Sequence, residues 1–292
     1  MSEIAATMAR LATQEGVTQT GVPGVRIYKT SRDIPRTPLL YQQGVIIVGQ
    51  GSKRVYLGDD VYVYDPDHYL VLSVPLPAEC EATVSEDEPL LSMVVDIDMG
   101  MLGGIISQLE DQAQCECLRP GCRHPGLSLA RADEAFKETA LRLLRALESP
   151  VESRVLGQGL VRELIFRIMC GENAASLHAL ATKNTGLSRI DKALKQIHSN
   201  FSQPFNVDQL AGFVNMSTSA FHRAFKDVTA LSPIQYLKKV RLNRAKILLV
   251  DEGLRASDAA RMVGYESVSQ FSREFKRYFG ASPRHLPEMQ RA

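Results

Sequence analysis

The stretch Val263–Pro283, which reads VGYESVSQFSREFKRYFGASP, repeats an earlier part of the same chain. When Val207–Pro233 is laid on Ser257–Pro283, nine of the 27 aligned positions are identical. The identical pairs are Asp208/Asp258, Ser217/Ser267, Ser219/Ser269, Phe221/Phe271, Arg223/Arg273, Phe225/Phe275, Lys226/Lys276, Ser232/Ser282 and Pro233/Pro283. This agreement is far above chance for the composition, so one structural unit is predicted to occur twice.

Each copy is predicted to be a helix, a tight turn and a second helix. An apolar face precedes the turn in both copies, and Gly264 can end a helix in a left-handed conformation. Ser217 and Ser267 then fall where an N-cap belongs, and Gln270 completes a capping box with Ser267. The residues of the apolar faces are Val207, Leu210, Ala211 and Val214, and Ala259, Ala260 and Val263.

The second helix of each copy carries phenylalanines four residues apart, which predicts one buried side. These phenylalanines are Phe221 and Phe225 in the first copy and Phe271 and Phe275 in the second. Arg223 and Arg273 must then point outward. Small crossing helices with a basic outer face have the shape that enters a DNA major groove.

A long helix over Pro233–Val250, which contains both apolar and basic residues, is predicted to join the two copies. Such a helix spans roughly 25 Å at 1.5 Å per residue. The outer helices of the two copies are therefore expected about 34 Å apart, which is one turn of B-DNA. Both could then read the same face of one duplex.

These residues resemble the signature of the AraC/XylS family. The matching runs are Val263–Ser267, Gln270–Gly280 and Ser282–Pro283. The resemblance covers about Leu187–Leu286, with a looser first copy in which Ala230 stands where the family usually has glycine. The part around Gly49–Tyr69 more weakly resembles the cupin-like arm of some members. The resemblance implies a DNA-binding transcription regulator whose N-terminal domain often senses a small molecule or dimerises.

We expect the DNA contacts on the exposed early turns of the second helices, where the family reads base edges. The predicted base contacts are Ser219, His222, Arg223, Ser269, Gln270 and Arg273. Arginine suits guanine and glutamine suits adenine. The predicted phosphate contacts, which position the protein without reading sequence, are Lys226, Arg244, Lys276 and Arg277. The alternative for each is a solvated side chain, and the two serines could serve only to start their helices.

The N-terminal part is predicted to be an antiparallel β-barrel or sandwich with trailing helices. From Gly24 to about Asp98, short β-branched and aromatic runs alternate with turn signals. Helical periodicity follows over Ser128–Leu147 and over Val155–Met169, and the first ten residues read as a short amphipathic helix. The trailing helices are expected to cover the sheet or to form a dimer seam.

The predicted fold class is α+β, with a cupin-like barrel or sandwich followed by an all-α C-terminal domain. That domain consists of two helix-turn-helix units joined by a long helix. We predict a sensor or dimerisation domain over residues 1–173, a linker over 174–186, and the DNA-binding domain over 187–292.

The formal net charge of +1 hides an asymmetry between the two parts. From Gly186 to Ala292 there are 17 Lys and Arg against 9 Asp and Glu, while the remaining residues hold 17 basic and 24 acidic side chains. A basic C-terminal part is typical of a module that binds a polyanion. No run of ~18 apolar residues and no signal peptide occurs, so we expect a cytoplasmic protein without a membrane partner.

Cys115, Cys117 and Cys122 form the one other local concentration of chemistry. Thiols beside Arg119 and Arg123 could bind a metal or react with oxidants or electrophiles. Their spacing is not that of a zinc ribbon or finger, so reduced loop cysteines are the other interpretation. A thiol-based stress sensor with the same DNA-binding end is therefore the alternative function.

Enzyme signatures are missing from the sequence. No phosphate loop, nucleophile elbow or pair of catalytic carboxylates occurs, and His68 is the only histidine of the barrel region. We therefore expect a transcription regulator that is not an enzyme and uses no cofactor or metal. The expected partners are double-stranded DNA, a second copy in a homodimer, a small-molecule effector, and RNA polymerase for an activator.

Two further alternatives concern the barrel. The aromatic residues of the barrel region suggest that its interior binds a small apolar effector. The alternative is a barrel core that is filled by its own side chains and leaves no room for a ligand. These aromatic residues are Tyr41, Tyr56, Tyr62, Tyr64 and Tyr69. A small-molecule-binding barrel with a vestigial helical domain is the other alternative, and the intact pair Arg223 and Arg273 argues against it.

Overall fold

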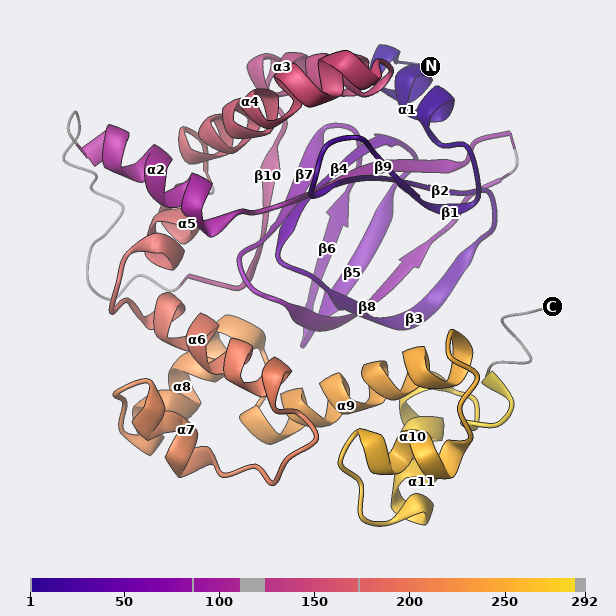
Figure 1. The fold of residues 1–292 in the computed structure, drawn as a ribbon, viewed down its shortest axis with the longest axis vertical. Helices are drawn as coiled ribbons and strands as arrows, with labels where there is room; N and C mark the ends of the chain where they lie inside the picture. Colours follow the sequence, from indigo (N-terminus) through magenta and orange to yellow (C-terminus); the bar gives the residue numbers. More distant parts are fainter. Residues whose placement is uncertain (1, 86, 111–123, 173, 287–292) are drawn as a thin grey trace.

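The computed structural model describes residues 2–85, 87–110, 124–172 and 174–286. Two β-sheets face each other in the N-terminal part, with a layer of helices above them and the helical C-terminal part below them in Figure 1. The predicted α+β fold class is confirmed. The N-terminal helix α1 (Glu3–Leu11) begins at the N-cap Ser2 and matches the expected amphipathic helix.

The strands form a six-stranded sheet in the order β1-β2-β9-β4-β7-β10 and a four-stranded sheet in the order β3-β8-β5-β6. Every strand pair in the described residues is antiparallel. The strands are β1 (Gly16–Gln19), β2 (Val25–Thr30), β3 (Ile34–Tyr41), β4 (Gly44–Gln50), β5 (Lys53–Leu57), β6 (Asp60–Tyr64), β7 (His68–Leu72), β8 (Leu76–Ala82), β9 (Leu90–Asp96) and β10 (Leu127–Arg131).

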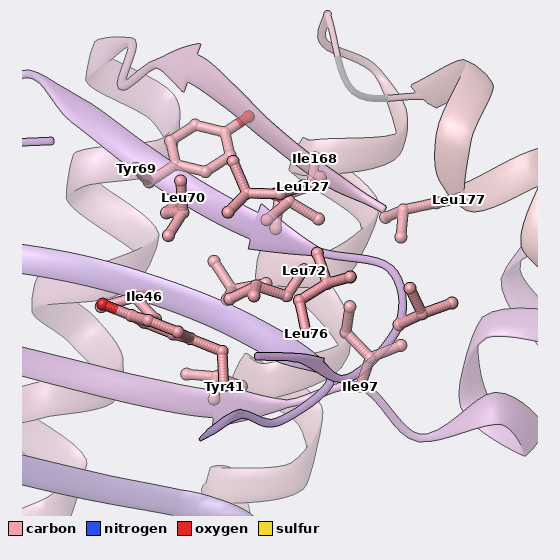
Figure 2. Close-up of a cluster of buried hydrophobic side chains, with 14 of the residues drawn as sticks. Tyr41, Ile46, Tyr69, Leu70, Leu72, Leu76, Ile97, Leu127, Ile168 and Leu177 are labelled. Atoms are coloured by element: carbon pink, nitrogen blue, oxygen red, sulfur yellow. The ribbon is translucent and has the colours of Figure 1, made fainter. Parts of the chain in front are cut away.

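The six-stranded sheet is buried on both faces, because side chains alternate between the opposite sheet and the helices. On β7, Leu70 points with Ile46 towards the interior between the sheets, where Figure 2 also shows Tyr41. The neighbouring Tyr69 faces the helical layer and stacks on Phe136 at a centroid distance of 4.1 Å. This explains why β4 and β7 read as continuous apolar runs.

The helical layer consists of α1, α3 (Glu134–Leu147) and α4 (Pro150–Met169). The sequence prediction began the first trailing helix at Ser128, which was wrong. Leu127–Arg131 instead forms strand β10 on the edge of the sheet, and α3 begins only after the N-cap Asp133. The sequence misled because the apolar helical period continues through Ala132 into the strand.

The second trailing helix buries the predicted apolar side only in its C-terminal half, where Leu164, Ile165, Ile168 and Met169 are buried. At the start of the predicted period, Val155 and Leu156 are instead 72% and 49% exposed. The buried residues of α4 are Ser153, Gly157, Val161, Leu164, Ile165, Ile168 and Met169. The N-terminal half of α4 therefore presents an apolar surface to solvent.

Two helices lie in stretches for which no helix was expected. Helix α2 (Met99–Glu110) follows β9, and α5 (Ala174–Ala181) lies within the stretch predicted as a linker. Leu177 and Leu180 of α5 are buried, and the helix packs against α2, α4 and α6. The division into domains remains a prediction, but this stretch is a packed helix in the structure.

The C-terminal part is entirely helical. Its elements are α6 (Gly186–Ser199), α7 (Val207–Phe213), α8 (Thr218–Thr229), α9 (Pro233–Val250), α10 (Ala256–Met262) and α11 (Val268–Phe279). The predicted long helix between the two helix-turn-helix units is α9, and Figure 1 shows α7 and α8 at one end of it with α10 and α11 at the other.

The two units differ in how they are packed. Phe221, Phe225 and Tyr236 belong to the same continuous core as the β-sheets, whereas Phe271 and Phe275 belong to a separate cluster. The first unit is thus built onto the N-terminal part, and the second unit has its own small core. Helix α9 connects them and lies along β3 and β8.

Candidate nucleic-acid interface

The first helices of the two units are related by a different offset from the second helices. Asn215 and Gly264 both take a left-handed conformation in the turn, with φ of 54° and 86°, and they are 49 residues apart. The serine N-caps that follow are 50 apart, because Glu266 adds one residue to the second turn. Asp208 and Asp258, which the ungapped alignment paired, are therefore not equivalent.

Helices α8 and α11 bury their phenylalanines and expose the opposite face. Phe221, Phe225, Phe271 and Phe275 are all fully buried, as predicted. The predicted base contacts are all exposed; they are Ser219, His222 and Arg223 on α8 and Ser269, Gln270 and Arg273 on α11. The structure therefore gathers each predicted trio on one outer helix face, where it is free to meet another molecule.

The predicted phosphate contacts are also exposed. Lys226 lies in the last turn of α8, and Lys276 and Arg277 lie in the last turn of α11. Arg244 lies on α9, with its guanidinium 5.8 Å from the ring centre of Phe201. Three of these cations thus lie at the C-terminal ends of α8 and α11, and the fourth lies on α9.

The predicted capping box at the start of α11 is only half formed. The Ser267 hydroxyl accepts a hydrogen bond from the Gln270 backbone N–H at 3.2 Å, as expected of an N-cap. The Gln270 side chain does not return to Ser267 but donates to Glu274 at 3.2 Å. The complete capping box lies instead at the start of α9, between Ser232 and Gln235.

Glu274 is the centre of a polar network that sequence reasoning missed. Its carboxylate accepts from the Lys238 ammonium at 2.9 Å and from the Tyr265 phenol at 2.8 Å. Burial alone would raise the pKa of Glu274, but the hydrogen bonds from Lys238, Tyr265 and Gln270 outweigh it and lower that pKa. Glu274 is therefore a carboxylate, although its side chain is only 14% exposed.

A shallow cleft of about 410 Å³ opens beside this network. Its lining residues are Gln270, Arg273, Glu274 and Arg277. Two of the predicted base contacts and one predicted phosphate contact thus border the same hollow on α11. No pattern in the sequence joins Lys238 to Glu274, because they lie 36 residues apart on different helices.

The inner face of the four-stranded sheet carries a polar group of its own. Lys53 is half-buried, and its ammonium lies 5.7 Å from the ring centre of Tyr28 and 5.5 Å from that of Tyr41. Burial lowers the pKa of Lys53, and the neighbouring Cys80 thiol, rather than a carboxylate of the described residues, partly opposes this shift. A buried cation beside two aromatic rings without a carboxylate partner would be stabilised by a bound anion.

The predicted aromatic lining of the barrel is only partly internal. Tyr41 and Tyr64 are buried between the sheets with their hydroxyls 3.4 Å apart, and burial raises the pKa of both. Tyr69 faces the helices, and Tyr56 donates to Glu81 on the outside of the sheet.

The predicted thiol cluster, Cys115, Cys117 and Cys122, lies outside the described residues. Within the described residues, no group of three or more His, Cys, Asp and Glu side chains is placed to hold a metal ion. His68 is the half-buried first residue of β7, and its Nδ1 lies 2.9 Å from the Asp65 carboxylate across the turn that precedes this strand. No helix in the described part of the chain is long and apolar enough to cross a membrane.

Two family models match the chain. One, described as the N-terminus of AraC-type transcriptional regulators, matches residues 21–176, and the other, described as a helix-turn-helix domain, matches residues 210–289. The N-terminal part and the helical C-terminal part of the fold are thus each matched by one model.

Among curated proteins, the transcriptional regulator AlkR of Acinetobacter baylyi is 38% identical over 96 residues, which are 33% of this chain and 31% of AlkR. The transcriptional activator RhaS of Escherichia coli is 27% identical over 157 residues, which are 53% of this chain and 56% of RhaS. The chain covers 38% of the Msm operon regulatory protein of Streptococcus mutans and 28% of GbdR of Pseudomonas aeruginosa.

Among solved structures, ToxT from Vibrio cholerae with a bound unsaturated fatty acid has a TM-score of 0.61 and 12% sequence identity. The match covers 91% of this chain and 94% of that one. At this identity the likeness shows a shared fold, in which a β-sheet part and a helical part are combined in the same order.

Proposed function

The chain belongs to the family of AraC-type transcriptional regulators, and we propose that it binds DNA in a sequence-specific way to regulate transcription. One observation carries this proposal. Two helix-turn-helix units present exposed trios of polar side chains on α8 and α11, while the repeated phenylalanine pairs of the same helices, Phe221/Phe225 and Phe271/Phe275, are fully buried.

We assign the reading of bases to these trios. Arg223 and Arg273 suit guanine, whose two acceptor atoms match a guanidinium, and Gln270 suits adenine. Ser219, His222 and Ser269 would contact base edges or water beside them. Lys226, Arg244, Lys276 and Arg277 would neutralise phosphates, so binding should weaken steeply as salt rises.

The test is equilibrium binding of the full chain to a duplex selected from a random library. Arg273→Ala should cost about 1–3 kcal/mol on the selected site and relax preference at one or two base pairs. Arg131→Ala is the matched control, because it removes one exposed arginine from β10, on the edge of the six-stranded sheet. Equal losses in the two variants, or an unchanged base preference in Arg273→Ala, would refute the assignment.

We further infer that the N-terminal part binds a small apolar molecule with an acidic group. Lys53 supports this inference, because its partner in the described residues is the Cys80 thiol and no carboxylate, and its ammonium lies close to the rings of Tyr28 and Tyr41. ToxT, which shares the fold, has been crystallised with an unsaturated fatty acid. A ligand would regulate by binding one arrangement of the two parts more tightly than the other.

This inference is tested by thermal stabilisation of the full chain with unsaturated fatty acids and with the corresponding alcohols. The acids should stabilise the chain and the alcohols should do so less, and Lys53→Met should abolish the difference. If neither class of compound stabilises the chain, its interior is closed by its own side chains, and dimerisation remains the role of the N-terminal part.

We also propose that α4 forms a homodimer seam. Val151, Val155 and Leu156 leave an apolar face of α4 open to solvent, with Val151 and Val155 70% and 72% exposed. Open apolar faces of this kind are typical of subunit contacts. Sedimentation of the full chain at tens of micromolar should show a dimer, and Val155→Glu should make it monomeric, whereas Val61→Glu on β6 should not.

A further inference from the structure

The carboxylate of Glu274 lies next to a predicted base contact but is turned away from solvent. It follows Arg273 on α11, yet only 14% of its side chain is exposed. One of its oxygens accepts from Lys238 of α9 and from Gln270, and the other accepts from Tyr265. The carboxylate therefore connects α11 to α9 and, at the same time, holds the side chain of a residue predicted to read a base.

A carboxylate accepts hydrogen bonds and cannot donate them, so it selects one end of the amide that faces it. The Gln270 side chain must present its nitrogen to Glu274. An amide on a free helix surface can turn over and exchange its donor for its acceptor. Adenine offers an acceptor and a donor in a set order, so an amide that cannot turn over discriminates better than one that can.

The negative charge of Glu274 does not oppose DNA binding in the way an exposed carboxylate would. The ammonium of Lys238 lies 2.9 Å away, and the pKa of Glu274 is lowered, so the ion pair is formed. Removing the carboxylate alone would leave Lys238 and the buried phenol of Tyr265 without their acceptor, and such orphaned groups are costly.

The first unit has no counterpart of this network. Ala224 lies at the place on α8 that Glu274 holds on α11, and Met216 lies at the place of Tyr265. The two otherwise repeated units therefore differ in how firmly their recognition helices are oriented. The second unit is therefore the one in which a hydrogen-bond network orients a side chain predicted to contact a base.

We propose that Glu274 is a specificity-determining positioning residue, which fixes the amide of Gln270 for reading one base pair. The proposal rests on the proposed DNA-binding function. Its consequence is that Glu274, without touching DNA, sets the preference at the base pair that Gln270 contacts, while the preference set by Arg273 is independent of it.

The experiment measures binding of the full chain to its selected duplex and to duplexes changed at single base pairs. In the wild type, the base pair read by Gln270 should be preferred as A·T on the order of tenfold. Glu274→Ala should remove most of this preference and leave the Arg273 base pair discriminated. Glu266→Ala is the matched control, because it removes one exposed carboxylate from the turn of the same unit.

Two further variants keep the test decisive. In a Gln270→Ala background, Glu274→Ala should change the base preference no further, because the amide it orients is gone. Glu274→Gln, which keeps the volume and one acceptor, should retain an intermediate preference and serves where Glu274→Ala does not fold. A preference unchanged in Glu274→Gln would overturn the proposal in that case.

Other results also overturn it. If Glu274→Ala weakens every duplex by one common factor, Glu274 only braces the helix. If its effect is the same with and without Gln270, it does not act through that amide. A wild type that prefers no duplex at all refutes the proposed DNA-binding function itself, whereas a wild type that discriminates elsewhere but not at the Gln270 base pair refutes this inference alone.

Discussion

The phenol of Tyr236 donates a hydrogen bond of 2.7 Å to the backbone carbonyl of Pro75, which joins the helical part to the sheets. Tyr236 is fully buried in α9, and Pro75 directly precedes β8. The same phenol oxygen lies 2.8 Å from His198 Nε2, so a neutral His198 with its proton on Nε2 donates to it. The helix that joins the two helix-turn-helix units is thus tied to the N-terminal part through its first turn.

Tyr236→Phe should lower the free energy of unfolding by about 1–3 kcal/mol, because the Pro75 carbonyl and the His198 N–H lose their partner. The ring itself would keep its packing on Phe225. Urea unfolding of the full chain measures the loss. Tyr56→Phe, which removes a half-exposed phenol bonded to Glu81, is the control and should change stability by less than about 0.5 kcal/mol. Equal losses of unfolding free energy in the two variants would mean that the Tyr236 hydroxyl does not stabilise the contact between the sheets and the helical C-terminal part.

The pH dependence of stability should carry a contribution from His198. Burial and, to a lesser extent, Arg244 lower its pKa from 6.5 to about 4. Between these pH values His198 is protonated in the unfolded chain and neutral in the folded chain. Its contribution to the free energy of unfolding is therefore fully present above pH 6.5 and is lost as the pH falls towards 4.

The loss should amount to roughly 3 kcal/mol at most, at 1.36 kcal/mol per pKa unit. Unfolding free energies measured across this pH range for the wild type and for His198→Gln give the comparison. The variant should be less dependent on pH in this window. Parallel pH profiles of the two proteins would show that His198 is not protonated on unfolding.

The two recognition helices end in the same left-handed conformation, but only one of them ends in glycine. Ala230 closes α8 with φ of 58°, and Gly280 closes α11 with φ of 77°. Ala230→Gly should stabilise the chain and Gly280→Ala should destabilise it, each by about 1 kcal/mol. The two changes are controls for one another, because opposite signs are required. A loss of stability in Ala230→Gly would show that the Ala230 methyl, which packs against the turn at Gly58, outweighs the backbone strain.

The contact between Gly126 and α8 leaves no room for a side chain. The Gly126 N–H donates to the Val228 carbonyl at 2.9 Å, and an added Cβ would lie 2.7 Å from that carbonyl oxygen. Gly126→Ala should therefore destabilise the chain by about 1–3 kcal/mol, as overpacking does. Gly103→Ala, in α2 with open space around it, should be neutral or stabilising. Similar thermal shifts in the two variants would contradict the tight packing at Gly126.

Local patterns in the sequence predicted the parts of the fold that depend on local chemistry. Phe221 and Phe271 are buried where a four-residue spacing placed them, and Ser217 and Ser267 are N-caps. The strand at Leu127–Arg131 escaped prediction because its partner, β7, lies more than fifty residues earlier. A five-residue strand has too few alternations to be told from the first turn of the helix that follows.

The candidate site was predicted to the level of residues but not to the level of their interactions. The exposed faces of α8 and α11 follow from helical period alone. The Gln270 amide illustrates the rest, since local sequence predicted a bond to Ser267 and the structure gives it to Glu274. Glu274 lies one helical turn after Gln270 on α11, so the bond itself is local, and a charged carboxylate is a strong acceptor for the amide N–H. Only the ammonium of Lys238, which comes from another helix, depends on tertiary structure.

We propose that one chain reads DNA with two helix-turn-helix units. The deciding measurement is the selection of duplexes from a random library with the full wild-type chain. The selected site should be asymmetric, with two preferred segments about 10–10.5 base pairs apart, one for α8 and one for α11. Arg223→Ala should relax one segment, and Arg273→Ala should relax the other. Recovery of no preferred sequence, or of one segment that both variants alter alike, would contradict it.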